Sequence, residues 1–182
     1  MAVPSSMVPL GTAMPAFVLP DTVTGARFDS NQLAGSPALV AFLCNHCPYV
    51  RHIADTLAGF GRFCDARGVR MVGISANDAA SYPDDAPDQM TDEARKRGYT
   101  FPYLYDESQA VAKRFDAVCT PEFFLYDAGG KLAYRGQFDE SRPKNAVPVT
   151  GADLRAAVEA LLESRRPSDD QRPSIGCSIK WR

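Results

Sequence analysis

Residues 37–57, PALVAFLCNHCPYVRHIADTL, contain the features that decide the fold. Pro37 precedes an apolar run at 38–43, which is typical of a strand buried on both faces of a parallel or mixed sheet. After Pro48, apolar residues at spacings of three and four form one stripe of an amphipathic helix: Val50, Ile53, Leu57, Phe60 and Cys64. Gly68 is expected to end this helix. The order strand, two-cysteine turn, helix therefore lies at the centre of the predicted fold.

The flanking sequence predicts further alternating strands and helices. We expect a hairpin at 15–30, strands at 69–75, 118–126 and 131–135, and helices at 88–97, 106–115 and from 150 onward. Asp106 with Gln109, and Thr150 with Asp153, are expected to cap the last two helices. This order indicates an α/β fold with a central mixed sheet flanked by helices, an N-terminal hairpin extension and a C-terminal tail. It places the cysteine pair at the C-terminal end of a central strand, where ligands and chemistry collect.

Composition excludes several classes of function. The chain has 182 residues, 45% of them hydrophobic and 23% charged, which describes one ordinary globular domain. A formal net charge of -2 gives no general attraction for nucleic acid or anionic lipid, so neither is an expected partner. No apolar run approaches the roughly 20 residues of a membrane span, and the first 17 residues lack the pattern of a secretory signal. We therefore expect the protein to be located in a reducing cytoplasm. Its five cysteines, an odd number, argue against a structural disulfide framework.

The pair Cys44 and Cys47 fits either redox chemistry or half of a metal site. A zinc site would need a second pair of ligands, and the other cysteines are scattered singles. A C-x-x-C turn between a strand and a helix favours a redox dithiol. We therefore expect none of the site residues to be a metal ligand. Copper or zinc binding by Cys44, His46 and Cys47 stays open as a non-enzymatic alternative.

Three stretches carry a resemblance to a known family: PLGTAMPAFVLPDTVTGARF, PALVAFLCNHCPYV and VCTPEFFLYDAGGKLAYRG. They resemble the redoxin branch of the thioredoxin superfamily, related to alkyl hydroperoxide reductase and thiol-specific antioxidant proteins. The C-terminal PSIGCSIKW is similar to the tail of a subgroup with the same C-N-H-C-P-Y motif. The resemblance implies a thioredoxin fold, with a domain at 1–165 and a tail at 166–182 that contains Cys177.

The resemblance also implies roles for site residues. Cys44 would be the exposed attacking thiol, Cys47 the resolving thiol, and Pro121 a cis-proline facing them. Protein or small-molecule disulfides and a thiol reductant are the implied partners, and no organic cofactor is implied. A cis peptide before Pro121 would expose the Thr120 backbone to pair with an extended substrate by strand addition.

Elementary electrostatics adds expectations for the pair. A cysteine at a helix N-terminus can have its pKa lowered from about 8.5 to roughly 3.5–7.5, and Cys44 is expected to benefit. A protonated His46 would favour the thiolate and make the disulfide more oxidising. Pro48 disfavours helical geometry at Cys47, so the helix should start or kink there.

Thiol–disulfide exchange is the first functional hypothesis, and thiol peroxidase activity is the second. Peroxiredoxins resemble the first half of the chain and carry a proline seven residues and a threonine three residues before the peroxidatic cysteine. Pro37 fits this pattern, whereas Ala41 lacks the hydroxyl expected to activate a peroxide at Cys44. Exchange is therefore favoured.

The remaining cysteines and His52 receive separate expectations. Cys64 completes the helix stripe and is expected in the core, Cys119 in a packed strand, and His52 on the surface. The tail could fold back so that Cys177 or Trp181 covers the Cys44 site. Cys177 is therefore a candidate third redox cysteine that forms a disulfide during turnover.

Overall fold

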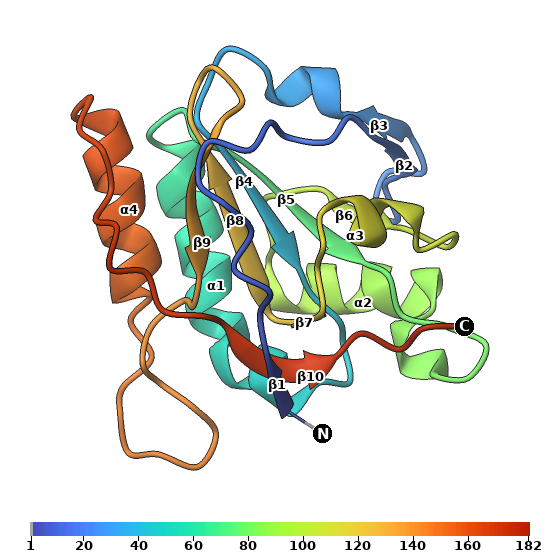
Figure 1. Cartoon of the computed structure of the whole chain (residues 1–182). Helices are drawn as coiled ribbons and strands as arrows, with labels where there is room; N and C mark the ends of the chain where they lie inside the picture. The colour runs from blue at the N-terminus through green and yellow to red at the C-terminus, as the bar shows by residue number, and fades with distance from the viewer. Residues whose placement is uncertain (1) are drawn as a thin grey trace.

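The computed structural model describes residues 2–182, and its centre is a five-stranded sheet (Figure 1). In spatial order the strands are β6 (Tyr103–Tyr105), β5 (Arg70–Ser75), β4 (Ala38–Phe42), β8 (Glu122–Tyr126) and β9 (Leu132–Gly136). β4 lies in the middle, parallel to β5 and antiparallel to β8. Every β4 residue is buried, because both faces of this apolar strand are covered. The predicted central strand of a mixed sheet is confirmed.

Helices and the N-terminal segment cover the two faces of the sheet. The helices are α1 (Pro48–Asp65), α2 (Pro87–Arg97), α3 (Ala110–Arg114) and α4 (Ala152–Leu162). Leu39 and Ala41 belong to a core shared with α1, α2 and α4, whereas Val40 and Phe42 belong to a second core with α3 and the N-terminal segment. This division follows from the alternation of side chains along a strand.

The N-terminal hairpin consists of β2 (Val18–Pro20) and β3 (Arg27–Asp29), followed by the short 3-10 helix η1 (Ser30–Leu33). Gly25 has a φ of +73° in the turn, a left-handed conformation that glycine adopts without steric cost. The predicted hairpin is confirmed, but it is more than an edge element. Phe17 and Leu19 are buried in the second core.

The first residues of the helices test the helix starts and caps expected from the sequence. α1 begins at Pro48 with Cys47 as an extended N-cap, so the helix starts there, as expected from the proline. The expected helix start at Asp106 with Gln109 is wrong, because α3 begins at Ala110 and its N-cap is Gln109. Asp106 instead accepts the Ala112 N–H at 2.8 Å. The expected Thr150–Asp153 capping box is wrong, because the N-cap of α4 is Gly151. Asp139 instead accepts the N–H groups of Thr150 and Gly151, at 2.7 and 2.6 Å.

A second, three-stranded sheet joins the two ends of the chain to the cysteine region. Its order is β1 (Ala2–Pro4), β10 (Ile175–Ser178) and β7 (Cys119–Thr120), with β10 antiparallel to both neighbours. Figure 1 shows the red tail crossing below β7 beside the blue N-terminal strand. β1, β6 and β10 were not predicted as strands. Within residues 2–182, no helix is long and apolar enough to span a membrane.

Candidate active site

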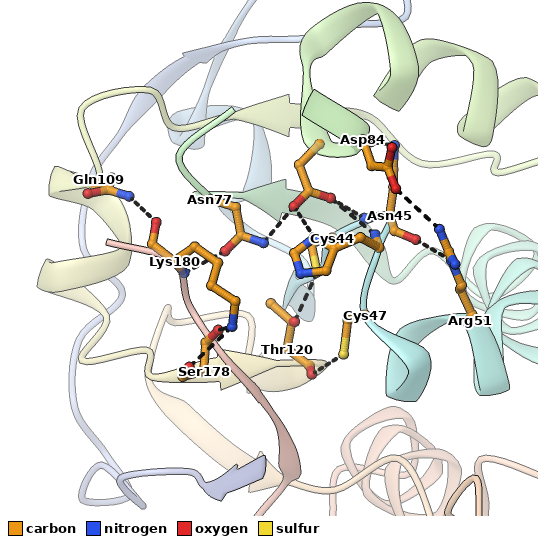
Figure 2. Close-up of polar contacts among 12 residues, drawn as sticks. Cys44, Asn45, Cys47, Arg51, Asn77, Asp84, Gln109, Thr120, Ser178 and Lys180 are labelled. Carbon is orange, nitrogen blue, oxygen red and sulfur yellow. Dashed lines mark hydrogen bonds and ion pairs between the residues drawn. The ribbon is translucent and has the colours of Figure 1, made fainter. Parts of the chain in front are cut away.

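The Cys44–Cys47 turn lies between β4 and α1, and Figure 2 shows both cysteines beside Thr120. Both cysteines are buried, with exposed fractions of 1% for Cys44 and 0% for Cys47. The expectation that Cys44 is an exposed thiol is therefore wrong. Cys44 is enclosed by Thr120 and by Asp85 from the 3-10 helix η2 (Pro83–Asp85), whereas Cys47 lies against the tail.

Thr120 contacts both thiols. Its Oγ1 lies 3.2 Å from Cys44 Sγ, and its carbonyl oxygen accepts a hydrogen bond from Cys47 Sγ at 3.2 Å. The peptide bond between Thr120 and Pro121 is cis, as expected. The structure thus brings together the four residues predicted from the sequence to form the site: Cys44, Cys47, Thr120 and Pro121. Cys47 and Thr120 are 73 positions apart in the sequence.

The backbone of Thr120 is already paired with the protein's own tail. Cys177 stands opposite Thr120 in the antiparallel ladder between β10 and β7, and Ser178 stands opposite Cys119. A Cβ atom on Gly176 would lie 2.0 Å from the Thr120 carbonyl oxygen, so this close approach requires glycine. The edge expected to bind an extended substrate is therefore occupied in this structure.

Asp85 anchors the cysteine turn, and sequence reasoning missed it. Its carboxylate is fully buried, with Oδ2 2.5 Å from His46 Nδ1. Oδ1 accepts the backbone N–H groups of Asn45 and His46, at 2.7 and 3.2 Å, and Asn77 Nδ2 donates to Oδ2 at 2.8 Å. His46 also stacks on Tyr82, with ring centroids 5.2 Å apart. His46 is thus a fixed neighbour of the pair rather than a solvent-exposed spacer. The one available signal for Asp85 was its place in a loop after β5, at the same sheet edge as Cys44.

Residues 10–135 match the family model of the AhpC/TSA family. This chain belongs to the AhpC/TSA family. An uncharacterized conserved protein from Geobacillus kaustophilus is 46% identical, with a TM-score of 0.98 over 100% of this chain and 97% of that chain. A hypothetical protein from Sinorhizobium meliloti 1021 is also 46% identical, with a TM-score of 0.96 over 98% of each chain. The resemblance to the redoxin branch is confirmed.

More distant solved structures place this AhpC/TSA family member in a wider fold. A secreted Mycobacterium tuberculosis disulfide oxidoreductase homologous to E. coli DsbE is 23% identical, with a TM-score of 0.61 over 80% of this chain and 96% of that chain. At that identity the similarity shows the fold alone, and the expected thioredoxin-like fold is confirmed. No functionally curated protein matches the chain in sequence.

The thiolate of this family member is favoured on Cys47 and not on Cys44. The pKa of Cys47 is lowered to about 5, first by a hydrogen bond from the Cys44 thiol and then by the Cys177 thiol and the N–H groups of Val50 and Cys177. The pKa of Cys44 is raised well above its usual value by its bond to Cys47, by burial and by the Asp85 charge. The expectation of a lowered Cys44 pKa is wrong, because the first turn of α1 begins at Pro48 and reaches Cys47 instead.

Three donor groups of this family member have the spacing of a metal site, but two of them, His46 and Asp85, are already bonded to each other. The donor atoms of Cys44, His46 and Asp85 lie within 4.8 Å of one another. Asp85 takes the place that the sequence hypothesis gave to Cys47. Both of its oxygens accept hydrogen bonds from protein donors, so a metal would have to displace Asn77, the turn N–H groups or the imidazole. The geometry fits an imidazole–carboxylate pair better than a ligand set.

The other cysteines and His52 have distinct surroundings. Cys64 is buried on α1, and burial raises its pKa to about 12, which confirms a core role. Cys119 is buried in β7, as predicted, and burial and Glu122 raise its pKa. His52 is partly buried, and its Nε2 lies 2.7 Å from Ser141 Oγ.

Of the two tail residues expected to cover the site, Cys177 is the one that reaches it. Cys177 contacts Cys47 through its thiol and its backbone N–H. Trp181 lies under Lys113 of α3, at 5.6 Å from the ring centroid, and is 42% exposed. The tail therefore folds back to the site, as predicted, and does so as the strand β10, whose Cys177 faces Cys47.

Proposed function

We propose that this AhpC/TSA family member is a thiol–disulfide oxidoreductase that uses the Cys44–Cys47 pair. The observation that carries the proposal is the position of the two thiols at the end of β4, where Thr120 contacts both of them and where the pKa of Cys47 is lowered to about 5. A thiolate is the nucleophile in disulfide exchange, so the reduced pair holds the reactive species at neutral pH. The substrate disulfide would be reduced to two thiols while the Cys44–Cys47 disulfide forms, and a thiol reductant would reverse that change.

The order in which the two sulfurs react belongs to the same proposal. The family resemblance assigns attack to Cys44 and resolution to Cys47. The negative charge on Cys47 favours the reverse order while the tail is bound. The single serine variants decide between the two orders, because the variant that keeps the attacking thiol retains a mixed disulfide with the substrate.

An exchange assay on four proteins tests the proposal. Wild type, Cys44→Ser, Cys47→Ser and Cys64→Ala are given a peptide disulfide with dithiothreitol as reductant. We expect each serine variant to lose turnover by roughly 100-fold or more, whereas Cys64→Ala keeps it, because Cys64 is a core residue. Unchanged turnover in both serine variants would contradict the proposal.

Peroxide reduction is the second candidate, favoured by one observation. Ala41 offers no hydroxyl, but Thr120 Oγ1 lies 3.2 Å from Cys44 Sγ and could donate a hydrogen bond to a bound peroxide. The raised pKa of Cys44 opposes this chemistry, since a peroxidatic cysteine must react as a thiolate. Peroxide consumption faster than disulfide exchange, and lost in Thr120→Val, would reverse the ranking. For either reaction we propose a reducing cytoplasm, a proposal that rests on the odd number of five cysteines in a chain long enough to fold without disulfides.

A further inference from the structure

The tail is bound along β7 as an added strand. Cys177 pairs with Thr120 in antiparallel register, and the Ile179 N–H donates to the Val118 carbonyl at 2.9 Å. β1 covers the other edge of β10, with Ala2 opposite Cys177. Strand addition of this kind is a general mode of peptide recognition, in which main-chain bonds supply affinity. The tail therefore makes the contacts that an extended substrate would make.

The fit of the tail depends on two further features. Gly176 passes so close to Thr120 that any side chain would collide with the Thr120 carbonyl oxygen. Beyond Cys177 the tail is clamped at Lys180, whose N–H donates to Asn77 Oδ1 at 2.8 Å and whose carbonyl accepts from Gln109 Nε2 at 2.9 Å (Figure 2). Cys177 is thus held in position from both sides.

Cys47 is the sulfur that contacts both other thiols. It interacts with Cys44 on one side and with the thiol and N–H of Cys177 on the other. Thiol–disulfide exchange requires a nucleophile, a central sulfur and a leaving sulfur, and the order Cys177, Cys47, Cys44 supplies these three.

We propose that β10 is a tethered substrate strand and that Cys177 is a third redox thiol, which exchanges with the Cys44–Cys47 disulfide. Cys177 loses its proton to solvent, and its thiolate attacks Cys47 Sγ. The Cys47–Cys177 bond forms, the Cys44–Cys47 bond breaks, and Cys44 leaves as a thiolate that takes up a proton. The disulfide changes position with no net oxidation or reduction.

The charge on Cys47 makes this step conditional on oxidation. In the dithiol form, burial and the neighbouring Cys47 raise the pKa of Cys177 to about 12, whereas Lys180 acts in the opposite direction. Once Cys47 is in a disulfide it carries no negative charge, so the Cys177 thiolate becomes easier to form. Burial opposes ionisation of Cys177 in both states, but the part of the opposition that comes from Cys47 is removed when the pair is oxidised.

The Cys47–Cys177 disulfide would act as a covalent latch. It fixes the tail across Thr120, so another peptide cannot pair with that edge, and it returns Cys44 to the thiol form. The latch rests on the proposed exchange activity for its source of the Cys44–Cys47 disulfide. While the Cys47–Cys177 disulfide is present, the tail blocks the Thr120 edge. A thiol reductant must reduce this disulfide before a substrate strand can bind there.

Disulfide mapping tests the latch directly. Wild type, Cys44→Ser and Cys177→Ser are equilibrated with oxidised glutathione, alkylated and digested without reduction. We expect both Cys44–Cys47 and Cys47–Cys177 peptides from wild type, Cys47–Cys177 alone from Cys44→Ser, and Cys44–Cys47 alone from Cys177→Ser. Absence of Cys47–Cys177 from Cys44→Ser, or pairing of Cys177 with another cysteine, would overturn the proposal.

A glycine variant tests whether the strand seats the thiol. In the Cys44→Ser background, Gly176→Ala should slow formation of Cys47–Cys177 by about tenfold or more and speed reaction of Cys47 with a small thiol reagent, because the tail is displaced. Gly59→Ala is the matched control, since its Cβ would meet nothing closer than Arg62 Nη2 at 3.7 Å. Equal rates for the two variants would contradict a tethered substrate strand.

The two proposals fail in different ways. If exchange with substrate proceeds but Cys44→Ser never forms Cys47–Cys177, the latch is wrong and the exchange function stands. If Cys47–Cys177 forms but no substrate disulfide is turned over, the three-thiol arrangement stands and the exchange function is wrong.

Discussion

At the scale of single residues, the protonation of the cysteine pair follows from what each sulfur contacts. Cys47 has hydrogen-bond donors around it, including the Val50 N–H in the first turn of α1. Cys44 has the Asp85 carboxylate as a neighbour, and that negative charge opposes a second one. The pKa values of the two cysteines therefore differ first because of the hydrogen bond between them. They differ further because Cys47 accepts an N–H of the helix start, while burial and Asp85 oppose a charge on Cys44.

The thiolate should be visible in a pH titration of the reduced protein. Ultraviolet thiolate absorbance is expected to rise with a midpoint at about pH 5, the pKa of Cys47. Cys47→Ser should remove this transition, and Cys44→Ser should move it upward, because the hydrogen bond from Cys44 is the largest cause of the lowered pKa. Cys64→Ala serves as the control and should leave it in place. Retention of the transition in Cys47→Ser would show that the charge belongs to Cys44.

Asp85→Asn should affect both the stability of the fold and the titration of Cys44. The substitution replaces charge-assisted bonds to the turn and to His46, so we expect a loss of about 1–3 kcal/mol in the free energy of unfolding. It also removes a charge that raises the Cys44 pKa, so that pKa should fall when measured in the Cys47→Ser background. Denaturant unfolding and thiolate absorbance measure the two effects.

Asp84→Asn is the matched control for that substitution. Its side chain is 69% exposed and pairs only loosely with Arg51 at 3.7 Å, so stability should change by no more than about 0.5 kcal/mol. Equal effects of the two substitutions would mean that Asp85 does not anchor the turn.

At the scale of elements, β7 is held in place by a buried carboxylate from β8. Glu122 is 1% exposed, and its Oε2 accepts the N–H groups of Val118 and Cys119, at 2.9 and 3.2 Å. Burial raises its pKa from 4.5 to about 7. The position of the strand that contacts both thiols therefore depends on a group that titrates near neutrality.

The raised pKa of Glu122 predicts a specific pH dependence of stability. Between pH 4.5 and about 7 the folded protein retains a proton that the unfolded chain has lost, so the free energy of unfolding falls as pH rises. The expected fall is on the order of 3 kcal/mol, complete above the folded-state pKa. In Glu122→Gln this contribution should disappear, while the exposed Glu159→Gln should follow wild type. Denaturant unfolding across this range checks the difference, and parallel curves for wild type and Glu122→Gln would contradict it.

Elements with strong local patterns could be predicted, and elements formed by distant pairing could not. β4 is buried on both faces and is therefore a continuous apolar run, whereas α1 is buried on one face and therefore has apolar residues at spacings of three and four. Both patterns can be recognised in the sequence alone. β10 has only four residues, and its strand conformation depends on pairing with β1 and β7. The same reason hid Asp85, whose role arises from contacts with residues 39 positions earlier.

At the scale of the whole molecule, the central sheet and the β1–β10–β7 sheet differ in how much buried core they contain. The central sheet contributes residues to both cores, whereas the β1–β10–β7 sheet closes over the cysteine pair with short strands. Local opening proceeds most easily where few buried contacts hold a segment. We therefore expect the small sheet to open without unfolding of the central one.

Native-state hydrogen exchange can resolve this difference. The amides of Cys177 and Ile179 should exchange at least about tenfold faster, after correction for sequence, than the amides of β4. Reduction should leave that order unchanged, while oxidation to Cys47–Cys177 should slow the tail amides. Equal protection of β10 and β4 under reducing conditions would contradict a tail that opens on its own.

Whether Cys44 and Cys47 form one redox couple can be measured by an equilibrium redox titration. The protein is equilibrated across glutathione buffers of graded potential, and alkylation with mass spectrometry gives the redox state of each cysteine. We expect Cys44 and Cys47 to oxidise together as a two-electron couple in Cys177→Ser, while the buried Cys64 stays reduced. If Cys44 and Cys47 both remain reduced across the whole range, or oxidise independently of each other, they do not form a redox couple.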